Sequence, residues 1–173
     1  DFGGGLERIA MAAANEPDIF RLSVFKKAIE KLEQATEKSY EDNKEQMRII
    51  ADHLRAATFM IAEGMEPSNK LQGYVLRRLI RRSAVMFYEL SDDNSPAEAF
   101  MDICESFINY YGELYFDEYK DIEKTKQIIS VELKKFATSL ERGLKELEKR
   151  QDSDLDVTFA FNLYQTHGFP FEI

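Results

Sequence analysis

The amino-acid sequence predicts an all-α protein, a multi-helix bundle with at most a short strand remnant at either terminus. Helix breakers are scarce, with 8 glycines and 4 prolines in 173 residues. Apolar residues recur every three or four positions, which is typical of helices with one buried face. No internal segment alternates polar and apolar residues well enough to indicate a strand. Since 44% of the residues are hydrophobic, we expect a packed core rather than disorder.

Two helices are expected in the N-terminal region. The first should begin after the glycines at positions 3–5 and stop near Pro17. Three of its residues are expected on the inner face: Leu6, Ile9 and Ala10. A second run, residues 18–34, carries apolar side chains at helical spacing and is expected to form one continuous helix.

The middle of the chain is expected to hold two longer helices. One spans about residues 43–62 and ends at Gly64, a residue that readily adopts the left-handed conformation of a helix stop. A loop over residues 65–70 then leads into a helix that continues to about Leu90.

Three further helices are expected towards the C-terminus. Ser95 and Pro96 form a start signal, with the hydroxyl as N-cap and the proline at the first helical position. The helices should span about residues 96–111, 118–150 and 157–167. Charges of both signs lie between the apolar residues of the long helix 118–150, which indicates a solvated face.

The overall charge restricts the possible partners. There are 23 lysines and arginines against 32 aspartates and glutamates, a formal net charge of −9. This balance argues against a general nucleic-acid coat, DNA included, and against a polybasic membrane binder, but it leaves room for a local basic patch. No apolar run approaches the roughly 18 residues of a membrane span. The only cysteine, Cys104, lies among apolar residues and is expected to be buried. Because a single cysteine offers no disulfide framework, a reducing, cytoplasmic location is expected.

The most distinctive segment is a basic stretch in the helix that ends at Leu90. Four arginines lie on one side of it, over an arc of roughly 140° at 100° per residue: Arg77, Arg78, Arg81 and Arg82. Four apolar residues are expected on the opposite, buried side: Val75, Leu76, Leu79 and Ile80. Guanidinium groups bind phosphate well, so this face predicts an anionic partner. The alternative is a helical packing or protein-interaction module in which acidic residues of adjacent helices neutralise the arginines.

The loop before the basic helix carries a side chain that is suited to recognising bases. Asn69 carries an amide that can both donate and accept hydrogen bonds, and such groups read base edges, where sequence information lies. A nearby group of this kind favours nucleic acid as the anionic partner.

The glycines at the N-terminus form a weaker signal. A glycine run that opens a helix exposes backbone N–H groups to a phosphate, and Arg8 follows one turn later. A flexible tail remains the alternative interpretation.

No constellation of residues predicts catalysis or metal binding by this chain. His53 is expected to be a structural histidine tethered to a neighbouring acid, and His167 is far from it in sequence. No spacing matches a metal motif or a nucleophile with its base.

Together these segments resemble the alanyl-tRNA synthetases, a family of class II aminoacyl-tRNA synthetases. Residues 1–10 resemble the D-x-G-x-G-L-E-R wording of motif 3, and residues 51–56 resemble an A-D-H-x-R segment. The most specific similarity covers residues 64–82, which include Asn69 and the arginines. Residues 132–143 and 161–170 then follow in the family's order. The resemblance spans the whole chain.

The resemblance implies that residues 1–16 end a class II catalytic core and that residues 17–173 form a helical tRNA-recognition domain. It implies that Arg8 contacts ATP, with its Mg²⁺, in a parent enzyme that attaches alanine to tRNA. Asp1, Gly3 and Gly5 match further positions of that site, and Asp1 would lie near the amino group of alanine. Because the rest of the core would lie elsewhere in a longer parent, the isolated piece is expected to be catalytically inactive and to hold no cofactor.

The resemblance also implies binding to the acceptor stem of tRNA(Ala) and sensing of its G·U wobble pair, through Asn69, the basic helix and Gln165. Many relatives carry an aspartate where this chain has Gln165, which keeps hydrogen-bonding ability but loses the charge. The segment 70–72 also departs from the smaller or more polar residues common before Gly73 and Tyr74.

Overall fold

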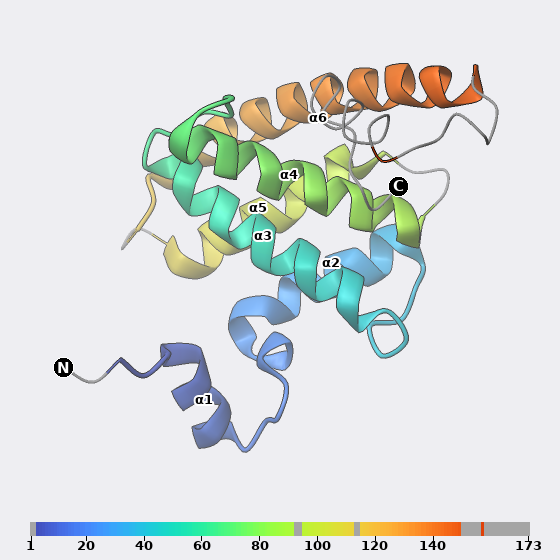
Figure 1. Cartoon of the computed structure of the whole chain (residues 1–173). Coiled ribbons are helices and arrows are strands. Elements are labelled where there is room, and N and C mark those ends of the chain that lie inside the picture. The colour runs from blue at the N-terminus through green and yellow to red at the C-terminus, as the bar shows by residue number, and fades with distance from the viewer. Residues whose placement is uncertain (1–2, 92–94, 113–114, 150–156, 158–173) are drawn as a thin grey trace.

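The structure, a computed structural model, describes residues 3–91, 95–112, 115–149 and 157 (Figure 1). These residues form six α-helices and a short 3-10 helix, with no strand among them, which confirms the all-α prediction for this part of the chain. The elements are α1 (Leu6–Ala14), η1 (Ile19–Arg21), α2 (Ser23–Thr36), α3 (Lys44–Ala62), α4 (Leu71–Leu90), α5 (Pro96–Tyr111) and α6 (Glu118–Glu148). Apart from Val157, the helix expected over 157–167 lies outside the described residues.

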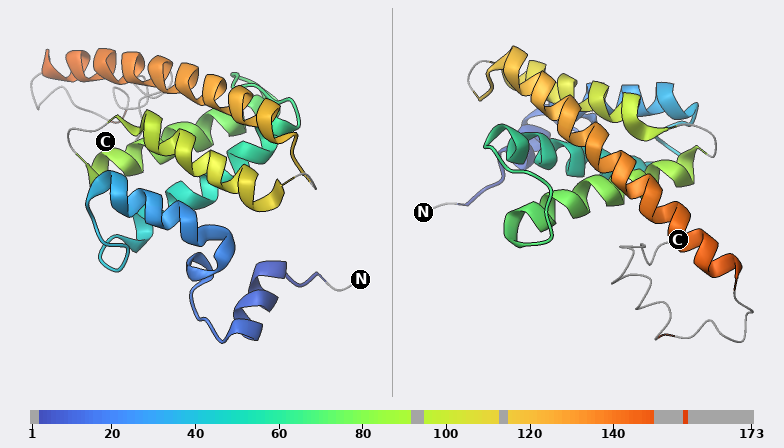
Figure 2. Two further views of the ribbon diagram at one scale, coloured as in Figure 1. Left: turned by 180° about the vertical axis from the view of Figure 1, so that it is seen from behind. Right: turned by 90° about the horizontal axis from the view of Figure 1, so that it is seen from above.

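Five helices make up the bundle, and α3 is at its centre. This helix packs against α4 most extensively and also contacts α2, α5 and α6. The long helix α6 lies across α4 and α5, and its C-terminal end reaches beyond them (Figure 2). As a result α4 is held between α3 and α6, with one side left for solvent.

The helix α1 lies apart from the bundle (Figure 1). None of its residues is buried, and all three residues expected inside are exposed: Leu6 is 77% and Ile9 52% exposed, and Ala10 is exposed as well. The predicted inner face is therefore wrong within this chain, because no described element covers it. An ion pair of 2.7 Å between Glu7 and Arg55 of α3 attaches α1 to the bundle.

The expected continuous helix over residues 18–34 is also wrong. Asp18 caps the short η1 by accepting a hydrogen bond from the Phe20 N–H, and Leu22 then adopts an extended conformation with ψ of 153°. The chain restarts as α2 at Ser23. The apolar spacing continues through the break, so periodicity alone does not reveal it.

Two predicted helix boundaries are confirmed. Ser95 accepts a hydrogen bond from the Ala97 N–H at the start of α5, with Pro96 at its first position. Gly64, with a φ of 93°, follows the end of α3, as expected of a helix stop in the left-handed region.

The core is formed mainly by phenylalanine, leucine, isoleucine and methionine side chains from α2 to α6. Cys104 is completely buried there, and burial raises the pKa of its thiol to about 12, so its expected role as a small apolar residue is confirmed. On the long helix α6, where a solvated charged face was expected, Glu132 is an exception because it is only 2% exposed.

Candidate nucleic-acid interface

The loop between α3 and α4 is packed tightly onto the first turn of α4. The Ser68 N–H donates to the carbonyl of Gly73 over 3.0 Å. A Cβ added at Gly73 would lie 2.3 Å from Ser68 Oγ and 2.5 Å from the carbonyl oxygen of Glu66. Only glycine permits this close approach, so the loop conformation depends on the absence of a side chain at position 73.

The side chain of Asn69, at the outer end of this loop, is oriented by the basic helix. Arg77 Nη1 donates a hydrogen bond to Asn69 Oδ1. A guanidinium group has only donors, so the amide oxygen must face Arg77 and the amide nitrogen must face away. Among the described residues nothing accepts a hydrogen bond from that nitrogen, and Asn69 is exposed. The arginine therefore orients the amide and leaves its donors available.

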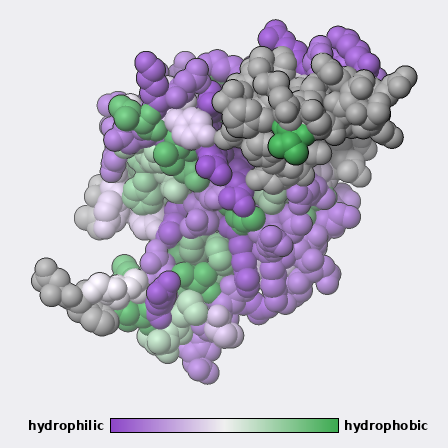
Figure 3. All heavy atoms as spheres, in the orientation of Figure 1, coloured by the Kyte–Doolittle hydropathy of each residue, from purple (hydrophilic) through white to green (hydrophobic). Residues whose placement is uncertain are grey.

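The outer side of α4 combines apolar and basic residues. Leu71 and Val75 are 83% and 49% exposed, and Arg78 is exposed one turn further on. Val75 was expected on the buried side, so that assignment is wrong: α4 buries a stripe through Leu76 and Ile80 instead. The surface in Figure 3 gathers apolar residues near the N-terminal end of α4 and over α1. A partner that docks here meets apolar surface next to a cation.

The backbone at Leu71 is unusual. Its φ of 48° lies in the left-handed region, which a branched side chain rarely adopts. This position belongs to the segment 70–72, just before the glycine on which the loop packs.

Arg81 does not face solvent. Its Nε donates to Glu132 Oε1 on α6 over 2.6 Å, and the two side chains are 16% and 3% exposed. Its guanidinium carbon also lies 5.4 Å from the ring centre of Phe136. The alternative of a neutralised basic face therefore applies to Arg81, whereas Arg78 has no ion-pair partner among the described residues.

Arg82 and His53 lie where α3 and α4 meet. Burial lowers the pKa of the His53 imidazole, and the positive charges of Arg82 and Arg78 lower it further against the opposing effect of Asp52. No described residue hydrogen-bonds to His53 Nδ1. The expected tether to a neighbouring acid is thus not observed, and His53 is instead a neutral group beside two arginines.

The N-terminal candidates lie at the start of α1. Gly3, Gly5 and Arg8 are all exposed, and Gly5 is the N-cap residue of α1. The described residues around them supply one cation and exposed backbone, which fits one edge of a nucleotide site. Asp1 and Gln165 lie outside the described residues.

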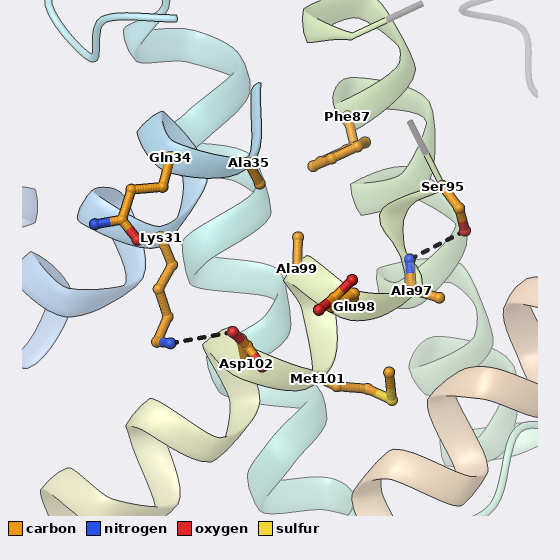
Figure 4. A pocket seen from close by; sticks show the side chains of 10 residues that line it. All are labelled: Lys31, Gln34, Ala35, Phe87, Ser95, Ala97, Glu98, Ala99, Met101 and Asp102. Atoms are coloured by element: carbon orange, nitrogen blue, oxygen red, sulfur yellow. Dashed lines mark hydrogen bonds and ion pairs between the residues drawn. The ribbon is translucent and has the colours of Figure 1, made fainter. Parts of the chain in front are cut away.

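A separate hollow of about 640 Å³ lies between α2, α5 and the end of α4 (Figure 4). Among the described residues that line it, Lys31 is the one cation and contacts Asp102 over 3.3 Å, and Glu98 adds a second carboxylate. This charge balance does not suit a phosphate, so the hollow is not part of the interface.

Within the described part of the chain, no group of three or more histidine, cysteine, aspartate or glutamate side chains could hold a metal ion. None of its helices is long and apolar enough to cross a membrane.

The fold and the basic helix define an all-helical domain of an acidic chain with a local cationic face beside an exposed amide. Comparison of the sequence with known families identifies its group. The family of class II tRNA synthetases, described as "tRNA synthetases class II (A)", matches residues 1–173, and the chain belongs to this family.

Several curated proteins are similar over the full length of the chain. The alanine–tRNA ligase of Orientia tsutsugamushi (strain Ikeda) is 38% identical over 183 residues, and that of Ureaplasma parvum serovar 3 (strain ATCC 27815 / 27 / NCTC 11736) is 36% identical over 187. The alanine–tRNA ligase of Hydrogenovibrio crunogenus (strain DSM 25203 / XCL-2) is 33% identical over 178 residues. All of this chain is covered in each case, but it spans only 20% of each relative's length.

Sequence reasoning missed how the basic helix is supported. The buried Glu132 was noted only within a resemblance, and no local pattern indicates that it pairs with a residue 51 positions earlier. The ion pair between Glu7 and Arg55 spans 48 positions and carried no signal either.

Proposed function

We propose that this chain is the part of an alanine–tRNA ligase that binds the acceptor stem of tRNA(Ala) and senses its G·U wobble pair. The exposed Arg78 contacts a backbone phosphate and thereby helps set the register of the RNA, whereas Arg77 orients Asn69 and Arg81 supports α4 through Glu132. Asn69 meets the shallow minor groove, which is the readable groove of an A-form helix. In this division residues 17–173 handle RNA, and residues 1–16 complete the ATP and alanine site of the parent.

The observation that carries the proposal is the orientation of Asn69. Arg77 holds the amide oxygen by one lone pair, so the amide nitrogen can donate and the second lone pair of the oxygen can accept. An amide fixed in this way loses little conformational entropy when it meets a base edge. The loop that holds it is fitted closely to Gly73, which keeps the amide in one place.

ATP and alanine are the other partners proposed for the parent enzyme, which joins them as an adenylate before transfer to tRNA. Within this chain Arg8 would contact the nucleotide, and the exposed backbone of Gly3 and Gly5 permits a close approach. The remaining walls of that site, and any residue that holds Mg²⁺, are assigned to other parts of the parent.

The proposal is tested with minihelices that carry G·U or G·C at the wobble position. Arg78→Ala should weaken binding to both and reduce the slope of log K against log salt concentration by about 0.9, the effect of one phosphate contact. Lys27→Ala, an equal change of charge on the exposed side of α2, is the control. Asn69→Ala should instead reduce the preference for G·U. An unchanged salt slope in the first variant and an equal loss on both stems in the second would contradict the proposal.

A further inference from the structure

A groove separates the loop before α4 from the long helix α6. It has a volume of about 260 Å³, and Pro67 lies on its loop side. Six residues of α6 line the other side: Lys124, Gln127, Ile128, Val131, Glu132 and Lys135. Four of them, Lys124, Ile128, Val131 and Lys135, lie at positions i, i+4, i+7 and i+11 of one helical face. The groove thus has a cation at each end, and its middle combines the apolar Ile128 and Val131 with the polar Gln127 and Glu132. Val131 is 45% exposed.

The two lysines of the groove have no ion-pair partner among the described residues. Two other lysines of α6, Lys126 and Lys145, and Lys149 just after its end behave differently, because each contacts a glutamate within 3.1 Å. At 1.5 Å per residue, Lys124 and Lys135 are about 16 Å apart along the helix. They form two separate cationic points rather than one cluster.

The carboxylates of the groove do not cancel these cations. Glu132 is engaged by Arg81 on the inner side of α6, so its charge is already balanced. Glu66, which is exposed on the loop, is the remaining acid. A carboxylate accepts hydrogen bonds only, and the ribose 2′-hydroxyl is a donor of that kind next to an RNA phosphate.

The loop side of the groove belongs to the same short segment that holds Asn69. Because Pro67 and Asn69 are only two positions apart, an RNA whose base edge contacts Asn69 would place the neighbouring part of its backbone at the groove. Since the chain as a whole has a net charge of −9, an RNA must be attracted by local cations of this kind.

We propose, on the basis of the proposed function, that this groove holds the sugar-phosphate backbone of the RNA strand next to the base pair that Asn69 contacts. Lys124 and Lys135 contact two separate phosphates, and Ile128 and Val131 pack against the apolar faces of the intervening riboses. The groove thus supplies contacts to the RNA backbone in addition to the contact that is proposed for Arg78.

The test compares two double variants of α6 with equal changes of charge. Lys124→Ala with Lys135→Ala should reduce the salt slope of minihelix binding by about 1.8, or two phosphate contacts, with an unchanged preference for G·U over G·C. Lys120→Ala with Lys134→Ala is the control, because both lysines are exposed on the same helix and outside the groove. A slope equal to that of the control would overturn the proposal and leave the groove to another part of the parent protein.

A second measurement identifies the phosphates. Single methylphosphonate substitutions along the minihelix should weaken binding of the unaltered chain at two separated positions, and these effects should vanish in the Lys124/Lys135 double variant. If Arg78→Ala and Asn69→Ala behave as proposed but these positions do not exist, only the groove assignment fails. If the unaltered chain prefers neither stem and shows no salt dependence, the proposed function fails as well.

Discussion

Replacement of Gly73 by alanine isolates the contribution of the loop before α4. The new Cβ would lie 2.3 Å from Ser68 Oγ and 2.5 Å from the Glu66 carbonyl oxygen, about 1 Å closer than ordinary van der Waals contact. The hydroxyl can rotate away, but the carbonyl belongs to the backbone, so the loop itself must retreat by about that distance.

The expected cost follows from two opposing effects. Overpacking of this kind typically costs about 1–3 kcal/mol, and the better helix propensity of alanine returns about 0.5–1 kcal/mol. We therefore expect Gly73→Ala to lower the free energy of unfolding by roughly 0.5–2 kcal/mol, measured by urea denaturation. Because the retreat displaces Asn69, the preference for a G·U over a G·C minihelix should fall at the same time.

Two controls separate the clash with the loop from other effects of a substitution in the first turn of α4. Gln72→Ala changes an exposed neighbour on the same turn and should leave both readouts unaltered. Ser68→Gly combined with Gly73→Ala removes the side-chain clashes but keeps the one with the Glu66 carbonyl, so it should recover only part of the loss. If Gly73→Ala is as stable as the unaltered chain and keeps its G·U preference, the packing of the loop does not position Asn69.

Three further predictions concern the surroundings of the basic helix. Arg81→Met leaves the Glu132 carboxylate buried without a partner and should cost about 3–5 kcal/mol in urea unfolding, most of which Glu132→Met in the same chain should restore; a cost below about 1 kcal/mol would show that the pair is not truly buried. The pKa of His53 is lowered in the folded chain, so below its ordinary pKa of 6.5 the unfolded chain binds a proton more readily than the folded one. The stability of the folded chain should therefore fall as pH drops through 6.5. In thermal unfolding, His53→Gln should lose less stability between about pH 7.5 and 5.5 than the unaltered chain. An equal loss in both chains would refute the contribution of this histidine. Leu71→Gly relieves the left-handed backbone without loss of buried surface and should stabilise the chain by roughly 0.5–1 kcal/mol, so a clear drop in the unfolding midpoint would contradict the conformation described for residue 71.

The sequence predicted the helices where the signal is local. Ser95 and Pro96 mark a start and Gly64 marks a stop, because the chemistry of helix ends involves residues only one to three positions apart. The break at Leu22 could not be predicted, since apolar residues continue on both sides of it and the cap formed by Asp18 is one of many compatible with the sequence.

The sequence predicted which elements carry the candidate site residues, but not the directions in which their side chains point. The arginines and Asn69 were correctly placed on a helix and the preceding loop, because both follow from spacing. The inward direction of Arg81 and the outward direction of Val75 depend on which side of α4 the helix α6 covers. That choice is made by contacts with residues some fifty positions away, such as Glu132, which no local pattern encodes.

The Arg81–Glu132 pair also limits how α4 and α6 can move. A slide of one helical turn, about 5.4 Å, would separate the two charges and leave the Glu132 carboxylate, whose side chain is 3% exposed, without a partner. Such a slip would carry the cost of a broken buried ion pair, so the pair sets the register of α4 against α6. A partner that contacts both helices therefore meets a surface whose spacing is set in advance by the ion pair.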